Sequence, residues 1–135
     1  MALEVVVVTP EGEAFSDRVD QVVLPGEAGE FGVLESHERF LTPLLLGPMQ
    51  IHRSGGTEWA AISSGFAEVD GSRVVVLVDS CALASEIDSA AVEARRAEAA
   101  DALASLPVAH ETEGERLRLM DVIARAELEL DVAGR

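Results

Sequence analysis

The residues best suited to catalysis or ligand binding in this 135-residue chain stand close together in its first third. Glu27, Glu30 and His37 form its one combination of carboxylates and imidazole beside a glycine-rich stretch. One imidazole without a second histidine or a thiolate at ligand spacing makes a poor site, and we expect no metal. A general acid–base pair would need a nucleophile and a substrate pocket, so we expect no catalytic residue either. Two interpretations remain, which are a solvated turn and a surface on which another protein docks.

The stretch that carries these residues reads V-V-L-P-G-E-A-G-E-F-G-V-L-E-S-H over residues 22–37. Proline fixes its own φ and donates no amide hydrogen, whereas glycine accepts a positive φ without a steric clash. We therefore expect a strand, then a tight loop with Glu27, Glu30 and Phe31 at its tip, then extended structure again. The residues that shape this loop are Pro25, Gly26, Gly29 and Gly32. An exposed loop that presents two carboxylates and an aromatic ring favours the docking interpretation.

Short apolar runs with turn residues between them predict a β domain over residues 1–86. Runs such as residues 74–78 have the length of a strand, and Asp70-Gly71 between two alternating segments is a strong hairpin signal. The prolines in residues 40–48 favour edge or corner strands there. About ten short strands at this spacing predict an antiparallel β-sandwich or flattened barrel.

Residues 87–135 differ in composition, and we expect them to form a second domain, an antiparallel helical hairpin. Eight alanines without glycine, proline or aromatic residues predict a first helix over residues 88–106, with Asp88 at its start and Pro107 as its stop. A second helix is expected at residues 115–132. A seam built from alanine buries few methylene groups, so we expect a weakly held, mobile appendage.

Composition excludes several classes of function. The formal charge is −15, from 25 acidic residues against 10 basic ones, all of them arginine. Such a chain repels nucleic acid and anionic lipid, and no apolar run approaches the ~18 residues that insert into a membrane. The lack of lysine excludes Schiff-base catalysis and a P-loop. Cys81 is expected to be a buried thiol, and without a targeting segment before the first strand we expect a cytosolic product.

The string L-P-G-E-A-G-E-F-G-V-L-E-S-H at residues 24–37 resembles the L-P-G-x-x-G-x-F-G-V-L-x-x-H signature of F-type ATP synthase epsilon subunits, the counterparts of mitochondrial delta. The resemblance covers most of the chain, including A-I-S-S-G-F-A-E-V at residues 61–69. It implies a β-sandwich docked on the gamma subunit and the c-ring, on the cytoplasmic face of the bacterial inner membrane. By position, the residues it assigns to that interface are Glu27, Glu30, Phe31 and His37.

The resemblance also implies a function. The chain would be a rotor subunit without an active site, coupling c-ring rotation to ATP synthesis. Its hairpin would lie folded on the sandwich or extend along gamma towards the alpha and beta subunits, restraining ATP hydrolysis. Acidic side chains that would meet these subunits are Glu113, Glu115 and Asp121.

Nucleotide binding is the remaining alternative. Ile87-Asp88 resembles the start of the I/L-D-x-x-R-A motif, which contributes to ATP binding in some members, although Ala91-Val92 stand where the motif has R-A. The candidate ATP-binding residues are Asp88, Arg95, Arg96 and Arg125. Arg118 and Arg125 are read more simply as helix partners of Asp121 and Glu129. The second candidate function is therefore a free-standing nucleotide sensor with the hairpin as its lid. No cofactor is expected beyond ATP as a regulatory ligand.

Overall fold

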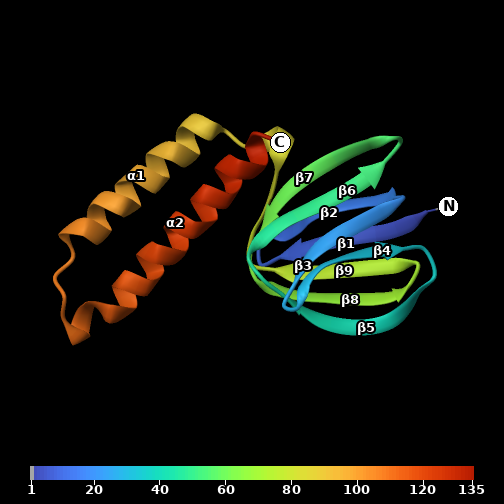
Figure 1. The fold of residues 1–135 in the computed structure, drawn as a ribbon, viewed down its shortest axis with the longest axis horizontal. Coiled ribbons are helices and arrows are strands. Elements are labelled where there is room, and N and C mark those ends of the chain that lie inside the picture. Colours follow the sequence, from blue (N-terminus) through green and yellow to red (C-terminus); the bar gives the residue numbers. More distant parts are fainter. Residues whose placement is uncertain (1) are drawn as a thin grey trace.

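The computed structural model describes residues 2–135 and consists of a ten-stranded sheet followed by two long helices (Figure 1). The strands are β1 (Leu3–Thr9), β2 (Gly12–Val19), β3 (Gln21–Gly26), β4 (Gly29–Leu34), β5 (His37–Leu44), β6 (Gly47–Arg53), β7 (Gly56–Ile62), β8 (Gly65–Gly71), β9 (Arg73–Val78) and β10 (Cys81–Leu83). The helical elements are η1 (Ala84–Glu86), α1 (Ser89–Ser105), η2 (His110–Thr112) and α2 (Glu113–Ala133). This order confirms the predicted fold class, a β-sandwich followed by a helical hairpin.

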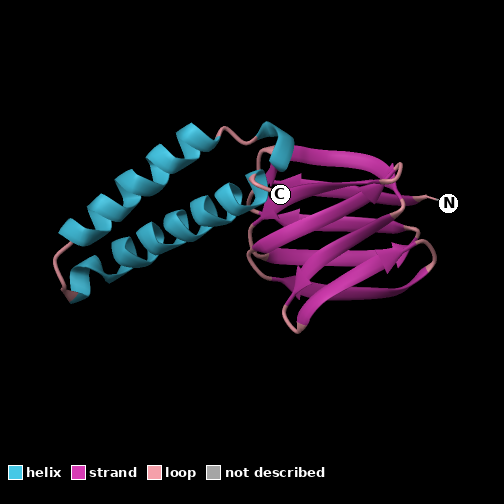
Figure 2. Ribbon diagram, turned by 45° about the horizontal axis from the view of Figure 1, so that its top comes forward, coloured by secondary structure: helices cyan, strands magenta, loops and turns pink. Residues whose placement is uncertain are grey.

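The sheet folds over on itself into two layers (Figure 2). Its strand order is β10-β7-β6-β3-β5-β8-β9-β1-β2, with β4 paired to β3 outside this path. The pairing of β1 with β9 is parallel, and the other pairings are antiparallel. Gly26 and Leu44 are the one residue pair that joins β3 to β5, so the sheet bends there. Pro43 lies beside this bend, in agreement with the corner strand that the prolines predict.

The core lies between the two layers and is built from alternate residues of the strands. In β6, for example, Met49 and Ile51 are fully buried while Gln50 between them points outwards. Among the residues that the structure describes, Ser63 is the one buried polar side chain. Its hydroxyl accepts hydrogen bonds from the amides of Asp79 (2.8 Å) and Ser80 (3.1 Å), so the burial is compensated. The loop after β7 is thereby tied to the turn between β9 and β10.

The two helices follow the predicted start and stop signals closely. Asp88 caps α1 by accepting a hydrogen bond from the Ala91 amide at 3.2 Å, and the helix ends before Pro107. The second helix begins at Glu113, two residues earlier than predicted. Its entry is shaped by the Thr112 hydroxyl, which donates to the Pro107 carbonyl at 2.6 Å.

Alanine and branched aliphatic side chains together form the seam between the helices. The residues buried there and at the base of the hairpin are Val92 and Ala99 of α1 and Leu119, Ala126 and Val132 of α2. The C-terminal half of α2 packs on β7, whereas α1 stands away from the sheet (Figures 1 and 2). Neither helix, in the part of the chain described, combines the length and apolarity that crossing a bilayer requires.

Gly65 gives a direct test of the close packing of β8 against β9. A Cβ at the start of β8 would overlap the carbonyl oxygen of Leu77 and lie 2.9 Å from Val78 Cγ1. We expect Gly65→Ala to lower the free energy of unfolding by about 1–3 kcal/mol, the usual cost of overpacking, in urea denaturation. Gly56→Ala is the matched control, because the nearest atom there is the Arg53 carbonyl oxygen at 3.8 Å. Equal stability of the two variants would contradict the account.

Candidate functional site

β3 and β4 form a β-hairpin whose turn is shorter than the expected tight loop. Gly26 pairs with Gly29, so Glu27 and Ala28 alone form the turn. Gly29 has a φ of +125°, which L side chains rarely adopt, and it is the one glycine of this hairpin whose backbone conformation requires that residue type. Of the three glycines, which can all accept a positive φ, Gly29 alone adopts one.

At Gly26 and Gly32, glycine is required for another reason, because neighbouring side chains lie too close to leave room for a Cβ. A Cβ on Gly26 would lie 2.8 Å from the ring of Phe31, and one on Gly32 would lie 2.6 Å from Nε2 of Gln21. The Phe31 ring is half-buried against the core and meets Phe40 edge-to-face, with ring centroids 5.6 Å apart. Phe31 was expected at the tip of a loop. It lies in β4 and stiffens the hairpin from below.

The carboxylates of this hairpin are exposed, as expected, and the backbone of His37 lies apart from them. Glu27 lies in the turn, and Glu30 lies in β4 opposite Pro25. His37 begins β5, beyond the far end of β4, and its side chain lies outside the part of the structure that is described. The strand from Glu30 to Leu34 alone spans about 13 Å at 3.3 Å per residue. We call Glu27 and Glu30 the acidic rim, and His37 is not part of it.

A second surface was not singled out from the sequence. The strand registers place Val8, Leu77, Phe66 and Pro43 in one row across β1, β9, β8 and β5, on the outer side of that layer. Phe66 is 52% exposed and Leu77 48%, and Leu41, two residues before Pro43 on the same side, is 65% exposed. These five residues are called the apolar face below. Large contiguous apolar surface of this kind marks an interaction site.

The sequence did carry a signal for this face. β9 reads R-V-V-V-L-V, so both of its sides are apolar although only one side can meet the core. The two ion pairs that border the face on the same side of the sheet are Arg39 with Asp70 (3.1 Å) and Arg73 with Glu4 (2.9 Å). Glu68 lies on the same side, exposed, between Phe66 and Asp70 along β8 and opposite Leu41 of β5, so one carboxylate stands at the edge of the apolar face.

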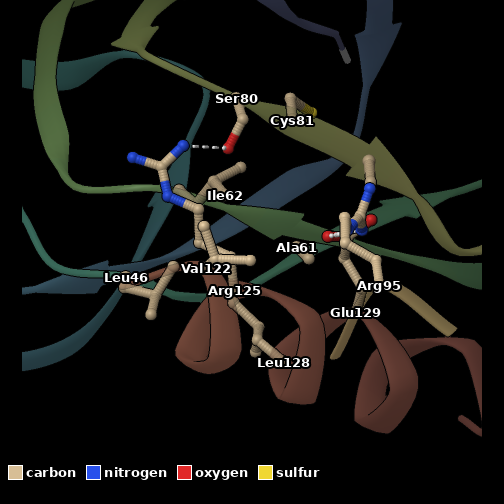
Figure 3. Close-up of a pocket in the computed structure, with 11 residues that line it drawn as sticks. Leu46, Ala61, Ile62, Ser80, Cys81, Arg95, Val122, Arg125, Leu128 and Glu129 are labelled. Carbon is tan, nitrogen blue, oxygen red and sulfur yellow. Dashed lines mark hydrogen bonds and ion pairs between the residues drawn. The ribbon is translucent and has the colours of Figure 1, made fainter. Parts of the chain in front are cut away.

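A cavity of about 340 Å³ separates α2 from the sheet at β7 and β10 (Figure 3). Its apolar lining includes Leu46, Ala61, Ile62, Val122 and Leu128. Of the four candidate ATP-binding residues, Arg95 and Arg125 line this cavity. Asp88 is used as the cap of α1, and Arg96 pairs with Glu93 at 2.5 Å, so neither belongs to its lining.

Both arginines of the cavity already hold carboxylates. Arg95 Nη2 lies 2.9 Å from Glu129 Oε2, while Arg125 Nε lies 2.9 Å from Asp121 Oδ2 and its Nη2 3.7 Å from Asp79 Oδ2. Three carboxylates against two guanidinium groups leave the site with a net negative charge. A polyphosphate would have to displace these partners before it could be held by them.

The ion pairs of α2 differ in part from the predicted ones. The pair of Arg125 with Asp121 is confirmed at four-residue spacing. Arg118 pairs instead with Glu115 at 2.6 Å, and Glu129 reaches across to Arg95 of α1. Among the side chains that the structure describes, no group of three or more His, Cys, Asp or Glu could hold a metal ion.

Known proteins resemble this chain along its length. A family model described as "ATP synthase, Delta/Epsilon chain, beta-sandwich domain" matches residues 2–84. The ATP synthase epsilon chain of Geotalea uraniireducens is 34% identical over 134 residues, covering 98% of this chain and 94% of the relative. That of Nitratidesulfovibrio vulgaris (strain Miyazaki F) is 41% identical over 87 residues, and the match covers 64% of this chain and 65% of the relative. The chain thus spans just under two thirds of the latter relative's length.

A solved assembly shares the fold. A chain in the cryo-EM structure of Euglena gracilis mitochondrial ATP synthase, OSCP/F1/c-ring in rotational state 1, superposes with a TM-score of 0.75. The match covers 99% of this chain and 82% of that one at 21% identity. At this identity the likeness establishes the fold, including the placement of two helices after the sheet.

Cys81 gives a pH-dependent test of the packing beside the cavity. Burial, with a smaller contribution from Glu86, raises the pKa of its thiol from the ordinary 9.0 to about 11. Because the folded state disfavours the thiolate, the free energy of unfolding falls as pH rises from the unfolded pKa towards 11. We expect this alkaline loss in urea denaturation between pH 8 and 10.5 to be smaller in Cys81→Ala, which has no thiol to ionise. An identical pH profile in both proteins would contradict it.

Proposed function

Because the chain belongs to the family of ATP synthase delta and epsilon chains, we propose that it is a non-catalytic subunit of the central stalk of an F-type ATP synthase. In this role it couples rotation of the c-ring to ATP synthesis and restrains ATP hydrolysis. It is held at the cytoplasmic face of the bacterial inner membrane through the complex, as a peripheral protein. The Euglena assembly that shares its fold is named for F1 and the c-ring, which supports the same placement.

The observation that carries this proposal is the apolar face of the sheet. Phe66, Leu77 and Leu41 are about half exposed or more, yet they stand on strands whose other side forms the core. Such a surface is stiff, because moving it would disturb the packing beneath it. We assign it to the gamma subunit, since an apolar patch on a rigid body suits a permanent interface that transmits torque.

The acidic rim is assigned to the c-ring. Glu27 and Glu30 are exposed on a short hairpin that Phe31 fixes to the core, so their positions are well defined. Carboxylates held in this way fit a partner surface with basic side chains, and they set orientation more than affinity. The resemblance adds His37 to the same interface.

The two domains have separate roles, which are docking and regulation. Residues 1–86 form the body that docks on gamma and the c-ring, and residues 87–135 form the regulatory hairpin. The alanines in the helix seam, and the single end by which the hairpin rests on β7, support a part that changes position at low energetic cost. In the extended position the hairpin reaches the alpha and beta subunits, where Glu113, Glu115 and Asp121 meet basic side chains.

A nucleotide sensor remains the second candidate function. The cavity beside Arg95 and Arg125 favours it, because it lies between the hairpin and the sheet. The carboxylates already bound to both arginines weigh against it. The assignment to the stalk therefore stands first.

The apolar face predicts which substitution breaks assembly. Phe66→Glu places a charge at the centre of this face, so we expect the tagged variant to lose at least tenfold in copurification with the gamma subunit of the same organism. Leu34→Glu is the matched control, because Leu34 is 56% exposed on β4, outside the apolar face. Circular dichroism verifies that both variants fold. If Phe66→Glu retained gamma as well as the control does, the assignment of this face would be wrong.

Removal of residues 88–135 tests the division of labour. We expect the shortened chain to assemble with gamma and the c-ring, because both docking surfaces lie in the sheet. ATP hydrolysis by the assembled complex should rise about fivefold, which corresponds to about 1 kcal/mol of lost restraint. Hydrolysis is measured on membranes with the full-length chain as reference. Failure of the shortened chain to assemble, or unchanged hydrolysis, would refute the regulatory role.

A further inference from the structure

The hairpin is attached to the sheet at one end only. α2 approaches β7 with its C-terminal half, while its N-terminal half and the tip between the helices project away (Figures 1 and 2). Leu117 and Met120 in the projecting half are 57% and 50% exposed, and Val108 at the tip is 93% exposed. The side chains that hold the hairpin in this position must therefore lie at its base.

Arg125 is the first of these side chains. Its Nη1 donates to the Ser80 hydroxyl at 3.3 Å (Figure 3). Its Nη2 lies 3.7 Å from Asp79 Oδ2, an ion pair beyond hydrogen-bond distance, and its Nε lies 2.9 Å from Asp121 Oδ2 on the same helix without a hydrogen bond. A single guanidinium group thus joins α2 to the turn between β9 and β10. The planar guanidinium group can face the Ser80 hydroxyl and both carboxylates at once, which suits this position between helix and turn.

The turn that receives Arg125 is itself fixed. The buried Ser63 hydroxyl accepts from the amides of both Asp79 and Ser80, and the Ser63 amide donates to the Ser80 carbonyl at 3.1 Å. Asp79 and Ser80 consequently keep their places when nothing is bound to them. Arg125 meets a preformed receptor rather than a flexible loop.

Arg135 is the second side chain at the base. Its guanidinium carbon lies 4.3 Å from the centre of the Trp59 ring on β7, and its nitrogen atoms also pair with Asp131 one turn earlier. A guanidinium group over the face of an indole ring is attracted by the negative potential of that face. Arg135 is ten residues after Arg125, about 15 Å further along the chain if helical spacing is kept, so the two contacts are separate.

The remaining forces at the base favour the docked position weakly or oppose it. The cavity of about 340 Å³ leaves much of the space between α2 and the sheet unfilled. Residues 1–86 carry 14 acidic and four basic side chains, and residues 87–135 carry 11 acidic and six basic ones, giving net charges of −10 and −5. Two bodies of like charge repel each other, and the two arginines act against this repulsion where the bodies meet.

We propose that Arg125 and Arg135 form a two-point latch that holds the hairpin on the sheet through the Ser63-supported turn and Trp59. The latch is complete within the chain, because groups of the protein itself pair with both guanidinium groups. Docking therefore needs no nucleotide in this protein. The inference rests on the proposed function only in giving the docked hairpin a regulatory meaning.

The single tryptophan of the chain reports the latch directly. In the isolated full-length protein, acrylamide quenching of Trp59 fluorescence measures how far the ring is covered. Arg125→Ala removes one point of the latch without touching the indole ring, so the quenching constant should rise at least twofold. Arg118→Ala is the matched control, because Arg118 lies on the same helix and pairs only with Glu115 in the contacts described. It should leave quenching unchanged, as should 5 mM ATP added to the unaltered protein at constant ionic strength.

A second variant keeps the test decisive if Arg125→Ala disturbs the helix. Asp79→Arg leaves α2 intact and sets two guanidinium groups against each other, so it should raise quenching in the same way. Quenching that stays unchanged in both variants would overturn the latch, and a fall in quenching with ATP would overturn its independence of nucleotide. Neither result would affect copurification with gamma, so failure of the latch and failure of the proposed function are distinguishable.

Discussion

The near closure of one sheet upon itself is the constraint on which the rest of this structure depends. The parallel pairing of β1 with β9 and the single residue pair between β3 and β5 bring ten short strands around one core. The side chains on the inner sides of the strands are buried in this core. Any large apolar side chain on the outer side, such as Phe66 or Leu77, contributes little to the stability of the chain alone. Apolar side chains on the outer surface are therefore available for contacts with other proteins.

The hairpin, in contrast to the sheet, does not enclose a core of its own. Its helices meet through side chains as small as Ala99 and Ala126, and only the end of α2 reaches the sheet. Beside the buried Val132, the polar contacts of Arg125 and Arg135 hold it at its base. A body that resists deformation and an appendage that is easily released can thus coexist in 135 residues. The division follows from where the methylene groups are, without any special hinge sequence.

Local signals predicted much of this fold. These signals act within a few residues of the chain, so the sequence alone is enough to recognise them. They are the strand lengths, the Asp70-Gly71 turn, the cap at Asp88 and the stop at Pro107. Register is harder, because it depends on which strand lies opposite. The glycine spacing suggested a loop, whereas pairing of Gly26 with Gly29 put Glu30 and Phe31 into β4.

The long-range contacts were beyond prediction from one sequence. The partners of Arg125 include Asp79 and Ser80, some 45 positions away, and Arg95 meets Glu129 through the helix seam. Helical periodicity finds partners three or four residues apart, so it assigned Arg118 and Glu129 to the wrong pairs. The outward position of Phe66 could have been inferred from the alternation in β8 and the two apolar sides of β9, because these patterns are local.

A rigid sheet and a separately held hairpin make up this protein. Hydrogen exchange of the full-length chain, followed by mass spectrometry of its peptides, measures this most directly. We expect amides of α1 and α2 to exchange at least about a thousandfold faster than those of β1, β8 and β9, through openings that leave the sheet intact. Equal protection of helices and strands, lost together in one cooperative opening, would contradict it.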